Sequence, residues 1–160
     1  MSATRAEILD TGEPKLKSAR ITIEAPASKI FKILASPKLH PKIDGSNSVK
    51  ALNWGPDQLS LGAKFGMHMK IGIKYRITNI VVEFEENKLI AWRHLGRWVW
   101  RYELEEIAPS RTVVTESFDG RPSPLQWWLR KRNAYRYAEV AVAKSLVRLK
   151  QFAEAGETAQ

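Results

Sequence analysis

The sequence contains no cysteine, which excludes disulfide bonds, thiol catalysis and zinc–thiolate sites. It also lacks a run of about eighteen consecutive apolar residues, the length that a membrane-spanning helix needs. Residues 1–17 mix charged and small residues and have no apolar segment typical of a secretory signal. These absences are compatible with a reducing compartment, and we expect a cytoplasmic protein.

Histidine is scarce as well, and its positions do not favour a metal site. His40, His68 and His94 lack the close spacing of metal ligands, and no cysteine supports them. The sequence contains neither a glycine-rich phosphate-binding loop nor the elbow motif of a serine nucleophile. We therefore expect no metal and no cofactor.

Positive charge, by contrast, is abundant. Lysine and arginine number 26 against 17 aspartate and glutamate residues, which gives a formal net charge of +9. Such a charge favours anionic partners, namely nucleic acid, lipid headgroups or acidic metabolites, but a solvated basic surface explains it equally well. With 160 residues, 44% of them hydrophobic, the chain can form one domain with a sizeable core.

The order of the predicted elements indicates the fold. A strand over residues 18–24 leads into two helical segments, the second limited by Pro41. Strand-like runs joined by short turns follow from about residue 49 to residue 119, which predicts an antiparallel meander. One long amphipathic helix is predicted over about residues 125–155. This order favours a curved sheet that grips a helix and encloses a pocket.

The predicted boundaries follow from the same patterns. Residues 1–17 have little periodicity, so we expect a flexible or loosely docked N-terminal arm. A single domain is predicted over residues 18–156, and residues 157–160 are predicted to form a disordered tail. Within the strand over residues 75–85, strict alternation breaks near residues 80–82, which predicts a bulge.

Several stretches resemble the START-related, helix-grip superfamily that is also called SRPBCC. They are the strand–proline–helix opening at residues 21–35, its continuation at 37–46, and the segments at 82–94 and 114–119. The details are similar to the polyketide cyclase/dehydrase and lipid-transport branch, in a largely actinobacterial subgroup, and the resemblance covers about residues 18–155.

This resemblance implies an α+β fold of one strand, two helices, six strands and a final helix. About seven antiparallel strands would then curve around the long C-terminal helix, with a hydrophobic cavity between them. The superfamily includes carriers of hydrophobic ligands, lipid-transfer domains, aromatase/cyclases and stress proteins. It therefore implies a cavity without naming its contents.

Apolar side chains that alternate along the predicted strands are candidates for the cavity wall. Aromatic rings offer broad apolar surface, and methionines adapt to flexible or aromatic ligands. Core packing explains each residue taken singly, whereas the group as a whole favours a cavity. The predicted ligand-binding residues are Met67, Met69, Trp92, Trp98, Trp100, Tyr102 and Glu116.

Glu116 stands out because it shares a strand face with Val114 and Phe118. A carboxylate on an apolar face is costly unless it is paired or protonated. It could anchor a ligand hydroxyl, or pair with His94 or an arginine. In an enzyme, His94 and Glu116 are the pair that we suspect of proton transfer. A structural salt bridge, or a register shifted by one residue, explains the pattern as well.

The start of the last helix interleaves aromatic and basic residues: Trp127, Trp128, Arg130, Lys131 and Arg132. Near a cavity entrance, tryptophan at the interface and arginine on anionic headgroups would suit a membrane. The same composition suits RNA, which we rank below a membrane. The pattern also fits helix turns whose tryptophans pack over the sheet edge while the arginines extend into solvent.

We therefore expect a protein that binds a hydrophobic small molecule or lipid in an internal cavity, as a carrier or sensor. Two alternatives stay open. One is an enzyme similar to polyketide cyclases and dehydratases that uses His94 and Glu116. The other is an interaction module whose basic, tryptophan-rich helix contacts a membrane or nucleic acid.

Overall fold

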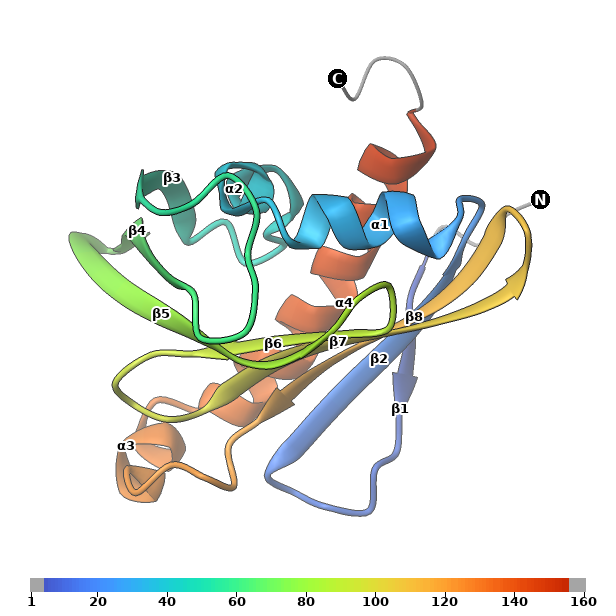
Figure 1. Cartoon of the computed structure of the whole chain (residues 1–160). Helices are drawn as coiled ribbons and strands as arrows, with labels where there is room; N and C mark the ends of the chain where they lie inside the picture. Colours follow the sequence, from blue (N-terminus) through green and yellow to red (C-terminus); the bar gives the residue numbers. More distant parts are fainter. Residues whose placement is uncertain (1–4, 156–160) are drawn as a thin grey trace.

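In the computed structural model, which describes residues 5–155, one antiparallel sheet curves around a long C-terminal helix (Figure 1). Neighbouring strands are hydrogen-bonded in the order β1-β2-β8-β7-β6-β5-β4-β3. The strands are β1 (Glu7–Leu9), β2 (Leu16–Ile23), β3 (Val49–Trp54), β4 (Lys64–Ile71), β5 (Ile73–Glu85), β6 (Leu89–Arg93), β7 (Val99–Ala108) and β8 (Arg111–Asp119).

The helices lie on one side of this sheet. The longest, α4, packs along β2 and β8 and also contacts α1, α2 and α3. Figure 1 shows α4 crossing the sheet from α3 at one end toward α1 at the other. The helices are α1 (Ala27–Leu34), the short 3₁₀ turn η1 (Pro37–Leu39), α2 (His40–Ile43), α3 (Gln126–Lys131) and α4 (Ala134–Glu154).

Local sequence explains where these helices begin and which faces they bury. Pro26, with φ of −70°, immediately precedes α1, and a proline lacks the N–H that the first helical turn leaves unpaired. Ile30, Phe31 and Leu34 then fall on one helical face, which is buried in the core. On α4, the buried face includes small residues beside larger apolar ones: Ala138, Ala141, Val142, Ser145, Leu146, Leu149 and Ala153.

A close contact holds the segment after α2 against the middle of α4. The backbone N–H of Gly45 donates to Ser145 Oγ at 2.8 Å, and Arg148 Nη1 donates to the carbonyl oxygen of Asp44 at 2.9 Å. A Cβ atom on Gly45 would overlap the backbone of Lys144 and Ser145, so only glycine allows this approach. The contact fixes the separation between α2, β3 and the helix.

The predicted fold class is confirmed: the protein is α+β, with a curved antiparallel sheet and a long C-terminal helix. The sheet has one strand more than the seven predicted, because Glu7–Leu9 pairs with residues 18–20 of β2. Part of the segment expected to be an arm is therefore an edge strand. The predicted tail at 157–160, like residues 1–4, lies outside the described residues.

Two predicted helix boundaries were wrong. The helix expected over residues 125–155 is two helices, separated at Arg132 and Asn133, and Asn133 adopts a left-handed conformation with φ of 52°. Pro41 does not limit the second N-terminal helix, because it occupies the first turn of α2, where proline is tolerated. The bulge in β5 is confirmed, since the pairing register with β6 shifts between Val81 and Glu83.

Candidate ligand-binding cavity

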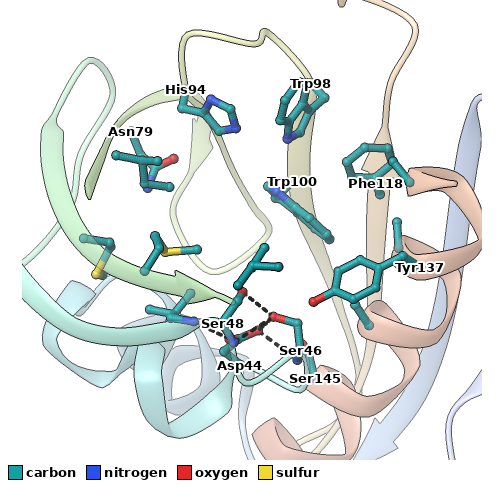
Figure 2. Close-up of a pocket in the computed structure, with 18 of the residues that line it drawn as sticks. Asp44, Ser46, Ser48, Asn79, His94, Trp98, Trp100, Phe118, Tyr137 and Ser145 are labelled. Carbon is teal, nitrogen blue, oxygen red and sulfur yellow. Dashed lines mark hydrogen bonds between the residues drawn. The ribbon is translucent and has the colours of Figure 1, made fainter. Parts of the chain in front are cut away.

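A cavity of about 760 Å³ lies between the sheet and the C-terminal helices. Strands β4 to β8 form one wall, and residues of α2, α3 and α4 with the loop after α2 form the other. Figure 2 shows His94 and Trp98 toward one end of this cavity, Asp44, Ser46 and Ser48 toward the other, and Trp100 between them. Small-molecule sites in proteins have volumes of roughly 300 to 1,000 Å³, so this cavity has the size of such a site.

The structure brings all seven predicted ligand-binding residues to the wall of this cavity. Met67, Met69, Tyr102 and Glu116 are buried, while the three tryptophans are half-buried. His68, between the two methionines, faces away and is exposed, as alternation along a strand predicts. The seven residues are Met67, Met69, Trp92, Trp98, Trp100, Tyr102 and Glu116.

Ring contacts hold the aromatic part of the wall in place. The Trp92 ring stacks on His40 with centroids 4.6 Å apart and lies 5.7 Å from the ring of Tyr102. Trp100 makes an edge contact with Phe118 at 4.9 Å. Such contacts between rings contribute beyond simple area burial and restrict ring rotation.

His40, which stacks on Trp92, is buried and lines the cavity as well. Its Nε2 lies 2.8 Å from the carbonyl oxygen of Leu34, which makes Nε2 the protonated nitrogen of a neutral ring. Burial lowers the pKa of His40 to about 4, although the bond to Leu34 and the charge of Asp44 oppose the shift. His40 therefore supports Trp92 as an uncharged side chain at neutral pH.

Glu116 is the buried acid of the cavity, and its cross-strand partner on β7 is Tyr102. Burial raises the pKa of Glu116 well above its usual range, and the charge of Asp44 adds to the rise, while hydrogen bonding from Tyr102 opposes it. Burial, together with the neighbouring Glu116, likewise raises the pKa of Tyr102. Within residues 5–155, Oε2 of Glu116 has no hydrogen-bond partner. The cavity wall therefore carries a carboxyl group that favours its neutral, protonated form.

His94 and Glu116 line the same cavity but do not contact each other as an acid–base pair. His94 Nδ1 accepts a hydrogen bond from the N–H of Gly96 at 3.1 Å, and its ring lies edge-on to Trp98 at 4.4 Å. Burial lowers the pKa of His94, with no contribution from Glu116. In the part of the chain that the structure describes, no hydrogen bond or ion pair joins the two side chains.

Glu116 does not pair with an arginine either. The nearest arginine on the neighbouring strand, Arg101, alternates with Trp100 and Tyr102 and so points to the opposite face of the sheet. There it donates to both oxygens of Glu83 at 2.7 Å and approaches Asp119 at 3.5 Å. The salt-bridge interpretation of Glu116 was therefore wrong.

Asp44 shapes a turn and also lines the cavity. Its carboxylate accepts hydrogen bonds from the backbone N–H groups of Ser46, Ser48 and Val49 at 3.0, 2.9 and 2.8 Å (Figure 2). Such bonds are typical of an aspartate that fixes a turn. This turn leads directly into β3 and places Asp44 in the lining of the cavity.

Residues 17–154 match the model of the family described as polyketide cyclase/dehydrase and lipid transport. The chain belongs to this family. A curated relative, the uncharacterized protein Rv0088 of Mycobacterium tuberculosis, is 39% identical over 113 residues, which cover 70% of this chain and 50% of that protein. The chain thus spans about half the length of the curated relatives that it matches.

Solved structures of related architecture support the helix-grip fold of this polyketide cyclase-like chain. Protein Ms6760 from Mycobacterium smegmatis has a TM-score of 0.66 at 14% identity, covering 94% of this chain and 98% of its own. The polyketide cyclase-like protein Cgl2372 from Corynebacterium glutamicum has a TM-score of 0.61 at 18% identity, covering 88% and 91%. At these identities the likeness shows the fold alone.

Several cavity residues of this family member were not predicted from its sequence. Asn79 is buried on β5, between the inward-facing Ile77 and Val81. The sequence feature that could have predicted its place is an amide among alternating apolar residues. Ile71, Ile73 and Tyr75 line the cavity from the β4–β5 hairpin. The sequence feature that could have predicted these three residues is the presence of apolar side chains around Gly72, at a hairpin tip where polar residues are usual.

The basic, aromatic segment lies at the cavity entrance. Trp128 and Arg132 line the cavity, and the Arg132 guanidinium lies 5.0 Å from the centre of the Trp128 ring. Trp127 is 62% exposed, so the interpretation that it packs over the sheet edge was wrong. Arg130 and Lys131 are exposed beside it. The break at Asn133 turns this short helix away from the axis of α4.

Other site types find no support among the described residues. Residues 5–155 contain no group of three or more histidine, aspartate or glutamate side chains that could hold a metal ion. No helix in the same range is long and apolar enough to cross a membrane.

Proposed function

We propose that this protein binds a hydrophobic small molecule or lipid in its internal cavity and acts as a cytoplasmic carrier or sensor. The observation that carries the proposal is a cavity of about 760 Å³ with an aromatic and aliphatic wall and one buried, incompletely bonded carboxyl group. The family description, which includes lipid transport, supports the same class of ligand.

The apolar wall favours ligands that bury hydrophobic surface. Met67 and Met69 on β4 line the cavity together with Ala138 and Ala141 of α4, whose small side chains leave space beside the helix. Methionine side chains adapt their shape, and the tryptophans of the same sheet provide broad flat surfaces. Removing apolar surface from water contributes about 25 cal/mol for each Å², which is the main source of affinity in such a site.

Glu116 and Tyr102 favour a ligand that carries a neutral polar group. A protonated carboxyl group donates a hydrogen bond and still accepts one, so it suits a carbonyl or hydroxyl oxygen. An anionic headgroup would have to lose its hydration beside another buried acid, which is costly. We therefore expect the ligand to be an uncharged amphiphile with its polar group at Glu116.

Native mass spectrometry of the purified protein tests this proposal, because a co-purified lipophile adds its mass to that of the chain. We expect Glu116→Gln to keep the ligand, since glutamine still donates and accepts hydrogen bonds. Glu116→Leu should weaken binding about tenfold, the effect of losing one hydrogen bond to a buried polar group. Thr115→Leu, on the opposite face of β8, is the matched control. A protein that is always empty, and that takes up no hydrophobic probe, would end the proposal.

A further inference from the structure

The entrance of the cavity is surrounded by apolar side chains that are exposed to solvent. They come from two segments far apart in the sequence, the β4–β5 hairpin and the region of α3 with the start of α4. Ile73 is the most exposed of them in the hairpin, at 77%, and Trp127 in the helix, at 62%. We call this set the entrance rim: Ile71, Ile73, Tyr75, Trp127, Trp128 and Tyr137.

The two segments meet across the entrance. All members of the rim except Trp127 line the same cavity. Burial raises the pKa of Tyr75, Tyr137 adds to that rise and Arg132 opposes it, so the three side chains lie near one another. Figure 1 places the tip between β4 and β5 and helix α3 at the same end of the molecule, whereas the β7–β8 hairpin lies at the other end.

Both segments are also basic and free of acidic residues. The sequence has no aspartate or glutamate from residue 58 to 82 or from 120 to 138. None of the exposed basic residues beside the rim forms an ion pair with any residue in the range 5–155. These residues are Lys70, Lys74, Arg76, Arg130, Lys131, Arg132 and Arg136.

We infer that the entrance rim docks on the surface of an anionic lipid bilayer. Exposed tryptophan, tyrosine and isoleucine would enter the interfacial region, and the surrounding lysines and arginines would lie among the acidic headgroups. Single-stranded nucleic acid fits less well, because the most exposed side chain is an isoleucine, which offers no ring on which a base could stack.

Docking in this position would bring the cavity entrance against the lipid. A hydrophobic ligand could then pass between bilayer and cavity with little exposure to water. This role of the bilayer as source or acceptor rests on the proposed function, whereas docking itself does not require a ligand. The two can therefore be tested separately.

Flotation of the protein with vesicles of phosphatidylglycerol or of phosphatidylcholine tests the docking. We expect binding to phosphatidylglycerol, weaker binding to phosphatidylcholine, and loss of binding as salt concentration rises. Ile73→Glu should weaken binding about tenfold, because it removes an aliphatic side chain that docking would bury in the bilayer and adds a negative charge at the surface. Ile107→Glu, at a 53% exposed isoleucine near the β7–β8 turn, is the matched control and should bind like the wild type.

Trp127→Glu repeats the test at a second exposed position, in case the first variant does not fold. Equal vesicle binding by the rim variants and the control would overturn the inference, as would no binding by the wild type. Salt-sensitive binding of RNA without binding of vesicles would also overturn it, as would a dimer that buries the rim. Native mass spectrometry of the wild type and of Trp127→Glu, whose residue does not line the cavity, reports ligand binding alone when vesicles are absent. A protein that contains a ligand but does not bind vesicles would therefore agree with the proposed function and contradict the docking inference.

Discussion

The buried carboxyl group of Glu116 on the cavity wall lowers the stability of the fold instead of adding to it. Among residues 5–155 its buried Oε2 has no hydrogen-bond partner, and such an atom costs roughly 1 to 3 kcal/mol compared with a bonded one. The nearby Tyr102 bonds too weakly to keep the pKa of the carboxyl group in its ordinary range. At pH values where the unfolded chain ionises this glutamate, the free energy of unfolding is therefore lower than with glutamine, which binds no proton in either state.

We predict that Glu116→Gln stabilises the protein, and more so as pH rises. Burial raises the folded-state pKa above the unfolded value of about 4.5, so folding retains a proton that the unfolded chain releases. The contribution of Glu116 to the free energy of unfolding is thus fully present below the unfolded pKa and is lost as pH rises toward the folded pKa. The difference between variant and wild type should grow by up to about 1.4 kcal/mol for each pH unit in that window.

Urea unfolding at pH 5 and pH 8 measures this difference. His40 acts in the opposite direction, because its lowered pKa removes stability as pH falls from about 6.5 to about 4. It is present in both proteins, so its contribution cancels when they are compared. A difference between the two proteins that does not change with pH would show that Glu116 is ionised in the folded state.

The inward direction of Glu116 could be predicted from the sequence, but its partner could not. Alternation with Val114 and Phe118 determines the face of β8 on which it lies. Its pairing with Tyr102 depends on the register between β7 and β8, which shifts between Glu106 and Ala108 near the turn. Alternation along one strand does not reveal such a shift in register. Pairing of Glu116 with His94 or with an arginine was therefore still compatible with the sequence.

At the scale of elements, the break between α3 and α4 determines which side chains lie at the cavity entrance. Asn133 occupies the left-handed region with φ of 52°, which ends α3 and lets α4 begin in a new direction. Asparagine adopts this conformation more readily than other residues except glycine. Continuous basic and aromatic residues concealed the break, and a polar Asn after three basic residues was its only local signal.

We predict that Asn133→Gly preserves stability, whereas Asn133→Ala destabilises the protein by about 1 kcal/mol. The left-handed conformation costs roughly 1 to 2 kcal/mol for a residue with a Cβ atom, such as alanine. Asparagine has part of this cost already, so the difference between the two residues is smaller. Thermal unfolding followed by circular dichroism measures both variants. If alanine proves as stable as asparagine, the two helices do not need the left-handed residue between them.

At the scale of the whole molecule, the order of strands and helices predicted the fold because the spacing of apolar residues identifies each element as a strand or a helix. Long strands such as β7 alternate cleanly, and α4 repeats its apolar residues at helical spacing. The volume left between them could not be predicted. It depends on how closely α4 approaches the sheet, and the contact of Gly45 with Ser145 sets that distance between segments 100 residues apart.

The space beside α4 leads to a prediction that joins fold and function. Ala141 is buried and lines the cavity, while its neighbour Val140 is 45% exposed. We predict that Ala141→Phe fills part of the cavity and excludes the ligand. If the added ring occupies empty space, it should stabilise the ligand-free protein by about 2 kcal/mol, given about 24 cal/mol for each Å³ of cavity filled.

Ligand binding stabilises a folded protein by mass action, so removing lipophiles with organic solvent should lower the Tm of the wild type. The Tm of Ala141→Phe should not respond to this treatment, and its native mass spectrum should show only the chain. Val140→Phe adds a ring to the same helix outside the cavity, so it should behave like the wild type in both measurements. An Ala141→Phe protein that is destabilised yet still carries a ligand would mean that the ligand occupies a different part of the molecule.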